Sequence, residues 1–367
     1  RQKKSEKEEA VLGETAVPDA VLTHNRRIVF RLDDSIYQVT TCGKREVVQL
    51  IRRARGLVPE PVALPECLKE DTFAAGGDLK AVFALGRKNM AYLSPHLGDL
   101  EDLRAAESRQ KALGQMSSLL GIHPVKAVCD KHPSYISSKG IERDMALFFE
   151  EKKKGSASIE KETEQEKRSQ KPEENIIKTG HHHAHILAVM AEHNIQGEVL
   201  GIAFDGTGYG EDKSVWGGEF LLCEGKSYRR VGHIESVEMT GGDASAKNAS
   251  VTAYCYLFAA VKKGYLSFKE AEAVFLPLNE GEKAVVKGAL KHHIHTVLSS
   301  SMGRLFDAVA AVLGICTENS YEGECPEKLQ AHAERYLRSL EKNIRREQGN
   351  REFLPDISEN FKISLYL

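Results

Sequence analysis

The sequence predicts an α/β fold made of two halves with similar organisation. In each half, three strand-like segments separated by glycine or polar turns come first, and segments with apolar residues at helical spacing accompany them. Glycine or acidic residues follow the first strand of each half, and strand ends in open α/β sheets are common ligand sites. We therefore expect two related α/β lobes with a binding site near the ends of these strands.

The N-terminal residues differ in character from both halves. Residues 1–17 are charged and polar and are expected to be disordered. Residues 18–64 contain short strand-like segments, among them SIYQVT and the basic segment QLIRRARGLVPEPV. This stretch is too short to bury a core of its own, so it is predicted to be the C-terminal part of another α/β domain.

The first half is assigned to residues 65–149. Its strand-like segments are FAAGG, LKAVFALGRK and NMAYLSPHL, and LEDLRAAESRQKALGQMSSLLG has apolar residues at helical spacing and a closing glycine. VKAVCD is predicted as a buried strand and HPSYISSKG as a loop. Residues 150–175 are almost purely charged and polar, so they are predicted to form a solvated linker.

The second half is assigned to residues 176–367 and repeats this logic. After the helical run HHHAHILAVMAEHN, the strand GEVLGIAFD ends in Asp205, GTGYG follows as a glycine loop, and WGGEFLLCEG and SYRRVGHIESV are the next strands. Two such halves that face each other across a cleft form the actin-like arrangement. We therefore expect duplicated ribonuclease-H-like lobes of that kind.

The composition excludes several classes of function. The chain has 367 residues, 41% of them hydrophobic and 28% charged, with a formal net charge of -2. A protein that binds nucleic acid normally shows a basic excess, so no nucleic-acid partner is expected. No apolar run of about 18 residues occurs, so no membrane span is expected. The seven cysteines form no C-x-x-C pair, which favours reduced thiols and a cytoplasmic location.

His181 and His185 form a candidate metal site with Asp205. The two histidines are four residues apart in a predicted helix, so both imidazoles lie on one face. Asp205 ends the strand that follows this helix. Two histidines and a carboxylate suit iron or zinc and leave coordination positions open for an oxygen ligand such as a phosphate. The alternative is that the histidines are surface residues that bind no metal.

Glycine-rich turns and one helix start are candidate anion sites. The glycine loop after Asp205 could bring backbone N–H groups close to a phosphate, but it could equally be a tight hairpin turn. In SSSMGRLFDAVAAVLG, a serine-capped helix start could lie beside a nucleotide, whereas Arg304 and Asp307 could simply pair with each other. Lys80 is a further anion candidate, although most basic side chains are only solvated.

These segments, taken in order, resemble the HypF carbamoyltransferase family over nearly the whole chain. THNRRIVFRLDDS and IRRARGLVP are similar to the end of the family's YrdC-like domain. AAGGDLKAVFALG, YLSPHLGDLEDL and CDKHPSY resemble the first lobe of its actin-like carbamoyltransferase domain. HHHAH, AFDGTGYG, WGGEF, GGDAS, SSSMGRLFDAVAA and SYEG resemble the second lobe. The resemblance implies a fragment that lacks the acylphosphatase-like domain, the zinc-finger modules, most of the YrdC-like domain and the extreme C-terminus.

The resemblance also implies an activity. The family binds ATP, takes its carbamoyl group from carbamoyl phosphate, and forms a carbamoyl-adenylate. The carbamoyl group then passes to the C-terminal cysteine of the partner HypE, as a precursor of the cyanide ligands of nickel–iron hydrogenases. By the same resemblance, a divalent metal (Fe²⁺ or Zn²⁺, with Mg²⁺ as a further choice) is expected on His181, His185 and Asp205. The expected catalytic residues are Asp205, Lys80 and His96. The expected nucleotide contacts are Gly206, Thr207, Gly208, Gly210, Gly242, Asp243, Gly303, Arg304, Asp307 and Glu322.

The chain departs from the family pattern near several expected site segments. Ala81 and His295 stand where asparagine is usual, Pro95 stands where glutamine is usual, and residues 248–251 replace an acidic–glycine–tryptophan–basic stretch. Three hypotheses follow. The chain is a carbamoyltransferase core, or an inactive remnant that binds metal or HypE weakly, or a transferase of the same chemistry with another acceptor, such as the small molecule of the antibiotic O-carbamoyltransferases or a tRNA.

Overall fold

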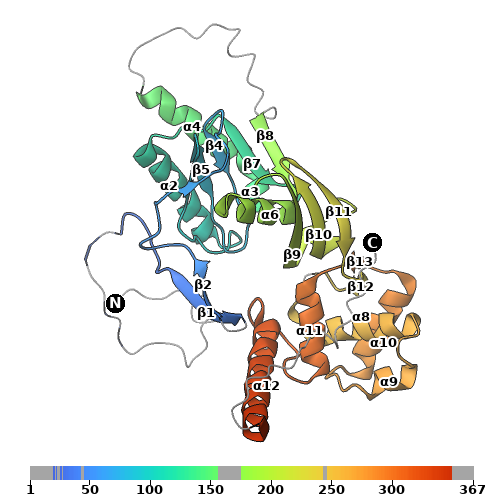
Figure 1. The fold of residues 1–367 in the computed structure, drawn as a ribbon. Helices are drawn as coiled ribbons and strands as arrows, with labels where there is room; N and C mark the ends of the chain where they lie inside the picture. The colour runs from blue at the N-terminus through green and yellow to red at the C-terminus, as the bar shows by residue number, and fades with distance from the viewer. Residues whose placement is uncertain are drawn as a thin grey trace.

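The computed structural model describes residues 20, 22, 25–26, 28–42, 45–155, 175–242 and 246–348. The predicted disorder of residues 1–17 and the predicted truncation of the second lobe at its C-terminus lie outside these residues. Within them, two β-sheets lie side by side in the upper part of Figure 1, and helices pack around both. None of the described helices is long and apolar enough to cross a membrane.

The first sheet has six strands in the spatial order β3-β6-β5-β4-β7-β8. Strands β4, β5 and β6 form an antiparallel meander, and β7 and β8 continue the sheet parallel to β4. The three strands predicted after Phe73 and the buried strand VKAVCD are therefore confirmed. The bounds are Val62–Ala63 (β3), Thr72–Ala74 (β4), Ala84–Arg87 (β5), Met90–Leu93 (β6), Lys126–Asp130 (β7) and Ile176–Thr179 (β8).

Helices α2 (Leu103–Leu120) and α4 (Ile141–Gly155) pack on this sheet with the short α3 (Ile136–Lys139). Helix α2 ends where Gly121 adopts a left-handed backbone with φ 62°, a conformation that glycine accepts without strain. In the core, the rings of Phe73 on β4 and Phe148 on α4 are 5.7 Å apart. Helix α4 extends into the predicted linker, so the linker begins later than residue 150. Glutamate and lysine are good helix formers, and a charged sequence can therefore prolong a helix.

The second sheet is built around a second antiparallel meander, β9-β10-β11. Strand β13 joins it parallel to β10, and β12 is antiparallel to β13. Three helices, α8 to α10, lie between β12 and β13 in the chain, and α11 and α12 follow β13. The bounds are Glu198–Tyr209 (β9), Val215–Glu224 (β10), Ser227–His233 (β11), Val237–Thr240 (β12), Ala249–Lys262 (α8), Phe268–Ala273 (α9), Glu280–His292 (α10), Thr296–Ser299 (β13), Met302–Val312 (α11) and Glu324–Gln348 (α12).

Two predicted domain boundaries need correction. Strand β8, assigned to the second half, pairs in parallel with β7 and so belongs to the first sheet. Strand β3, assigned to the N-terminal stretch, pairs with β6 and also belongs there. Short apolar segments look alike in a sequence whichever sheet they join, because pairing is decided by contacts distant in the chain. Helix α6 (His181–Glu192), which follows β8, packs against β9 and β10 and connects the two lobes (Figure 1).

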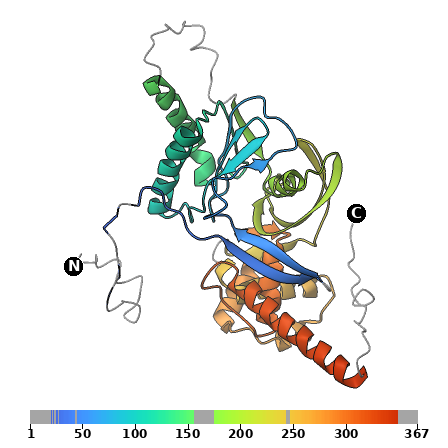
Figure 2. The same ribbon diagram turned by 60° about the vertical axis from the view of Figure 1, so that its left-hand side comes forward.

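Strands β1 (Ile36–Cys42) and β2 (Arg45–Arg52) form an antiparallel hairpin that lies beside the two lobes (Figure 2). Several of its large apolar side chains are exposed, including Tyr37, Val39 and Val48. A hairpin of two strands has little stability in isolation. That this stretch is part of another domain stays a prediction.

Candidate metal centre between the lobes

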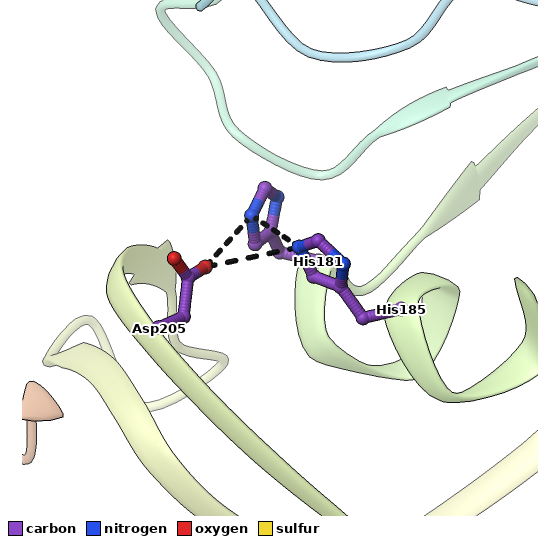
Figure 3. Close-up of side chains that lie close together, drawn as sticks. All are labelled: His181, His185 and Asp205. Carbon is purple, nitrogen blue, oxygen red and sulfur yellow. Dashed lines mark hydrogen bonds and ion pairs between the residues drawn. The ribbon is translucent and has the colours of Figure 1, made fainter. Parts of the chain in front are cut away.

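His181, His185 and Asp205 converge where α6 meets β9 (Figure 3). The two Nε2 atoms are 3.3 Å apart, and Asp205 Oδ2 lies 3.1 Å from His181 Nε2 and 3.9 Å from His185 Nε2. Both histidines are on one face of α6, as their spacing predicts. Among the described residues, these form the one group of three or more His, Cys, Asp or Glu side chains whose ligand atoms come this close.

This geometry fits a shared divalent ion. Metal–ligand bonds of about 2.1 Å place neighbouring tetrahedral ligands about 3.4 Å apart, and octahedral ones about 3.0 Å apart. The three measured separations lie around these values. Asp205 Oδ2 is buried, and it faces the ring nitrogens of His181 and His185, so the three groups point at one another as ligands of a single ion would. Two imidazoles and one carboxylate suit iron or zinc better than Mg²⁺, which prefers oxygen ligands and water.

Asp130, at the end of β7, fixes the orientation of His181. Its Oδ2 atom lies 2.8 Å from His181 Nδ1, so the ring turns Nε2 toward Asp205. A carboxylate behind a ligating histidine is the usual outer support of such a ligand. The sequence-based site did not include Asp130. The signal was present, because VKAVCD, like GEVLGIAFD, ends its apolar run with an aspartate.

The pKa shifts in the cluster show strong coupling between its charges. Burial disfavours the imidazolium of His181, but Asp130 and Asp205 outweigh burial and raise the pKa of His181 to about 9. Burial and the neighbouring His181 lower the pKa of His185. Burial favours the neutral form of Asp205, yet the adjacent His181 outweighs it and lowers the pKa of Asp205 to about 2. Without metal, the centre is thus a charged His181–Asp205 pair beside a neutral His185.

The glycine loop predicted after Asp205 is part of β9. Residues 206–209 continue the strand, with Gly208 opposite Trp216, and the chain turns only over residues 210–214. The register shifts opposite Asp205, between Trp216 and Gly218, so a bulge displaces this part of the strand. The prediction of a strand end at Asp205 was wrong, because a bulged glycine-rich strand and a loop have the same composition.

Close packing explains two of the glycines. A Cβ on Gly208 would collide with the ring of the buried His182, and a Cβ on Gly210 would collide with the indole of Trp216. Burial lowers the pKa of His182 to about 4, so this third histidine is a neutral packing partner of Trp216. These glycines are therefore required for local packing, whatever they bind. Thr207 lies between them and is exposed.

A buried ion pair lies beneath the bulge. Glu219 on β10 is fully buried, accepts hydrogen bonds from Gly217 N and Ser300 Oγ, and pairs with Arg230 Nε at 2.6 Å. The Arg230 guanidinium also stacks on the Trp216 ring, 4.1 Å from its centroid. The Glu219–Arg230 pair therefore holds the segment WGGEF of β10 in place. Strand β10 pairs with β9, which carries Asp205.

The start of α11 touches the backbone beside Asp205. Ser301 Oγ donates to Gly206 O at 2.6 Å and also caps α11 by accepting from Arg304 N at 3.0 Å. A Cβ on Gly303 would lie 2.8 Å from Gly206 Cα, so only glycine permits this approach. The glycine segment after Asp205 and the start of α11, both predicted as phosphate contacts, are thus adjacent. The N-terminus of α11 carries the positive end of the helix dipole.

Arg304 and Asp307 pair with each other at 2.9 Å, which was the simpler of the two sequence readings. Asp307 is fully buried, and its Oδ1 accepts from Asn319 Nδ2 at 2.9 Å. Burial raises the pKa of Asp307, although Arg304 opposes the shift. The Nε and Nη1 atoms of Arg304 are buried and have no hydrogen-bond partner among the described residues, so this guanidinium retains donors that an anion could use.

The other predicted residues lie away from the metal cluster. Lys80 on the first lobe pairs with Glu322 on the second at 3.3 Å. Burial and the charge of Arg52 lower the pKa of His96, whose charged neighbours also include Lys80. The contacts of the described residues therefore do not bring Lys80 or His96 to Asp205. Gly242 is a turn residue with φ 54°, and Asp243 lies outside the described residues.

A small pocket adjoins the metal cluster on the side of the first lobe. Its volume is about 290 Å³, and His181, His185 and Asp130 are among its lining residues. Most of the others are small, among them Ala74 and Gly76. The pocket can admit only a compact group beside the two histidines.

Comparisons with known proteins agree with this architecture. The family model described as "HypF Kae1-like domain" matches residues 68–192, and that described as "Carbamoyltransferase, Kae1-like Domain, second subdomain" matches residues 201–362. Carbamoyltransferase HypF of Synechocystis is 32% identical over 328 residues, which are 86% of this chain and 38% of that protein. A carbamoyltransferase HypF homolog of Cupriavidus necator is 31% identical over 287 residues, 74% of this chain and 65% of that protein.

Solved structures show the same fold. Full-length HypF in a phosphate- and nucleotide-bound form superposes with a TM-score of 0.69 at 31% identity, over 88% of this chain and 45% of that one. HypF of T. kodakarensis gives a TM-score of 0.65 at 29% identity, over 81% and 36% of the two chains. The predicted actin-like fold is confirmed. The chain spans well under half the length of the Synechocystis protein.

Proposed function

Because the chain belongs to the HypF carbamoyltransferase family, we propose that it forms the carbamoyl-transferring core of such an enzyme. In this proposal, ATP and carbamoyl phosphate yield a carbamoyl-adenylate, and the acceptor is the C-terminal cysteine of HypE. The acceptor sulfur bonds to the carbamoyl carbon while the bond between that carbon and the adenylate oxygen breaks, releasing AMP. The product belongs to hydrogenase maturation, and the scattered cysteines favour a cytoplasmic location.

The observation that carries this proposal is the His181, His185 and Asp205 cluster between the lobes. A divalent ion there would neutralise charge on a phosphate or carbamoyl oxygen. The chain's own part is to orient the ligands: Asp130 fixes the ring of His181, and the Glu219–Arg230 pair supports the strand that carries Asp205. Catalysis of this kind consists mainly of positioning and electrostatic stabilisation.

The neighbourhood of the cluster supports a nucleotide on the side of the second lobe. The start of α11 lies against the backbone of Gly206, and Arg304 in the first turn of this helix has donors without a partner within the described part of the chain. Helix starts and arginine are both favourable partners of phosphate. In this arrangement the nucleotide phosphates lie next to the metal, and the small pocket beside His181 and His185 receives the carbamoyl group or the acceptor thiol.

Carbamoyl-phosphate-dependent exchange between ATP and pyrophosphate tests the enzymatic claim. The purified chain should catalyse this exchange, and His181→Ala/His185→Ala should lose it. His193→Ala is the matched control, because His193 is exposed at the end of the same helix and outside the cluster. Exchange that is absent from the purified chain, and also from a longer version that contains this sequence, would support the inactive remnant and overturn the proposal.

The acceptor is tested separately. A peptide with the C-terminal sequence of HypE should gain one carbamoyl group, which mass spectrometry detects, and the peptide with serine in place of the terminal cysteine should not. Transfer to a small hydroxylated acceptor or to tRNA in preference to the peptide would assign the chain to the alternative acceptor classes.

A further inference from the structure

Two cysteine thiols lie together at the junction of α11 and α12. Cys316 follows α11, and Cys325 is in the first turn of α12. Both belong to the same buried apolar cluster, with relative exposures of 7% for Cys316 and 0% for Cys325, and their thiols are hydrogen-bond neighbours. The loop between them must therefore turn back on itself to bring its two ends into contact.

Polar contacts fix this loop closure. Cys325 N donates to Asn319 Oδ1 at 2.8 Å, and Cys316 Sγ donates to Glu318 O at 3.3 Å. Asn319 is in turn tied to Asp307 on α11. These hydrogen bonds hold the backbone of the loop in the turn that places the Cys325 thiol beside Cys316.

Four other cysteines have different surroundings. Cys129, Cys223 and Cys255 are buried in three other apolar clusters, and Cys67 is exposed. Neither thiol of the pair belongs to a group of three or more candidate metal ligands among the residues that the structure describes. A paired thiol without further ligands is suited to redox chemistry more than to metal binding.

We propose that Cys316 and Cys325 form a site of reversible oxidation, at which a peroxide converts the two thiols into a disulfide. The thiolate of Cys316 attacks one peroxide oxygen; an S–O bond forms, the O–O bond breaks and hydroxide leaves. The Cys325 sulfur then bonds to the Cys316 sulfur, the S–O bond breaks, and water leaves after taking up the Cys325 proton. Two electrons pass from the thiols to the peroxide.

The environments of the two thiols support this order. Cys316 is the more exposed of the two thiols, with a relative exposure of 7% against 0% for Cys325, and the ammonium group of Lys328 lies beside it. Burial, with Cys316 as a neighbour, raises the pKa of the Cys325 thiol, which therefore remains protonated until the second step. Cys316 is thus the first thiol to react, and Cys325 resolves the sulfenic acid.

Oxidation would fix a loop of the second lobe that contacts the first lobe. The loop between the cysteines carries Glu322, which pairs with Lys80 of the first lobe. It also carries Asn319, which bonds to the buried Asp307. A disulfide would limit the movement of this loop and so of both contacts. This inference concerns the thiol pair alone and does not depend on the proposed carbamoyl transfer.

The test uses the full chain treated with hydrogen peroxide. Free thiols are then alkylated under denaturing conditions, and the digested protein is mapped by mass spectrometry. A cross-linked peptide that joins residues 316 and 325, two hydrogens lighter than the reduced pair and lost after treatment with dithiothreitol, is expected. In Cys325→Ala, the linkage should disappear and Cys316 should instead be trapped by dimedone as a sulfenic acid.

The exposed Cys67 provides the internal control, because its oxidation shows that the peroxide reached the protein. Oxidised Cys67 alongside Cys316 and Cys325 that are both still alkylated would overturn the proposal, as would linkage of either cysteine to a different partner. Mapping of the wild-type chain decides the question even if a variant does not fold.

Discussion

Replacement of Asp130 by asparagine should shift the pH dependence of metal binding. Asp130 and Asp205 flank His181 and, against burial, raise the pKa of His181 to about 9 from an ordinary value of about 6.5. A difference of about 2.5 pKa units is on the order of 3 kcal/mol. Because the folded-state pKa is raised, this stabilisation of the metal-free protein is fully present below about pH 6.5 and is lost as the pH rises through about 9.

Metal must displace the proton of His181, so its binding has the opposite pH dependence. At pH 7, a pKa of about 9 for His181 reduces the apparent affinity roughly 100-fold, because two pH units separate the two values. The affinity of the wild type for Zn²⁺ should therefore rise about tenfold per pH unit and become constant near pH 9. In Asp130→Asn the constant region should begin closer to neutral pH, and its limiting affinity should be about 10- to 100-fold lower.

A competition titration against a chromophoric zinc chelator, repeated at half-unit steps of pH, measures both effects. Glu192→Gln is the matched control, because Glu192 is an exposed carboxylate at the end of α6. It should reproduce the wild-type curve. If the Zn²⁺ affinity became constant at the same pH in the wild type and in Asp130→Asn, the claim that Asp130 sets the protonation of His181 would be refuted.

Three further predictions concern stability and association. Arg109→Met should lower the free energy of unfolding by about 3–5 kcal/mol in urea titration, because it leaves the fully buried Asp144 carboxylate without its partner; an unchanged midpoint would contradict this role. Lys80→Ala and Glu322→Ala should each change stability by less than about 1 kcal/mol, and a double-mutant cycle should give a coupling of the same small size, because both side chains are largely exposed. Leu200, Ile202 and Phe204 alternate along β9 and are 55–59% exposed, so we expect the chain to self-associate through this apolar strand face. Phe204→Gln should reduce that association in sedimentation velocity; sedimentation unchanged from the wild type would exclude this face as the cause.

The organisation of the two lobes could be predicted because local sequence patterns indicate most of their strands and helices. Strands separated by turns and helices with apolar periodicity identify both meanders, α2, α6 and α11. The metal cluster could be anticipated for a related reason, since the spacing of His181 and His185 on a helix is itself a geometric constraint. Asp205 was added as the third ligand from its place at the predicted strand end, and the resemblance of several ordered motifs implied the same residue.

Other features depend on contacts that no local pattern contains. The pairing of β8 with the first sheet, the support of His181 by Asp130, and the bridge between Lys80 and Glu322 each join distant segments. The strand character of residues 206–209 was missed because glycine is usually a turn signal, whereas here it permits close packing against His182. The contact of Cys316 with Cys325 was missed because it depends on how the intervening loop turns.

Isothermal titration with ATP in the presence of Zn²⁺ or Fe²⁺ tests the central claim most directly, with the wild-type chain, His181→Ala/His185→Ala and His193→Ala measured in parallel. The account predicts metal-dependent nucleotide binding by the wild type and by His193→Ala, and its loss in the double variant. Nucleotide binding that is equal in all three proteins, or independent of the metal, would contradict a metal centre built from these histidines and Asp205.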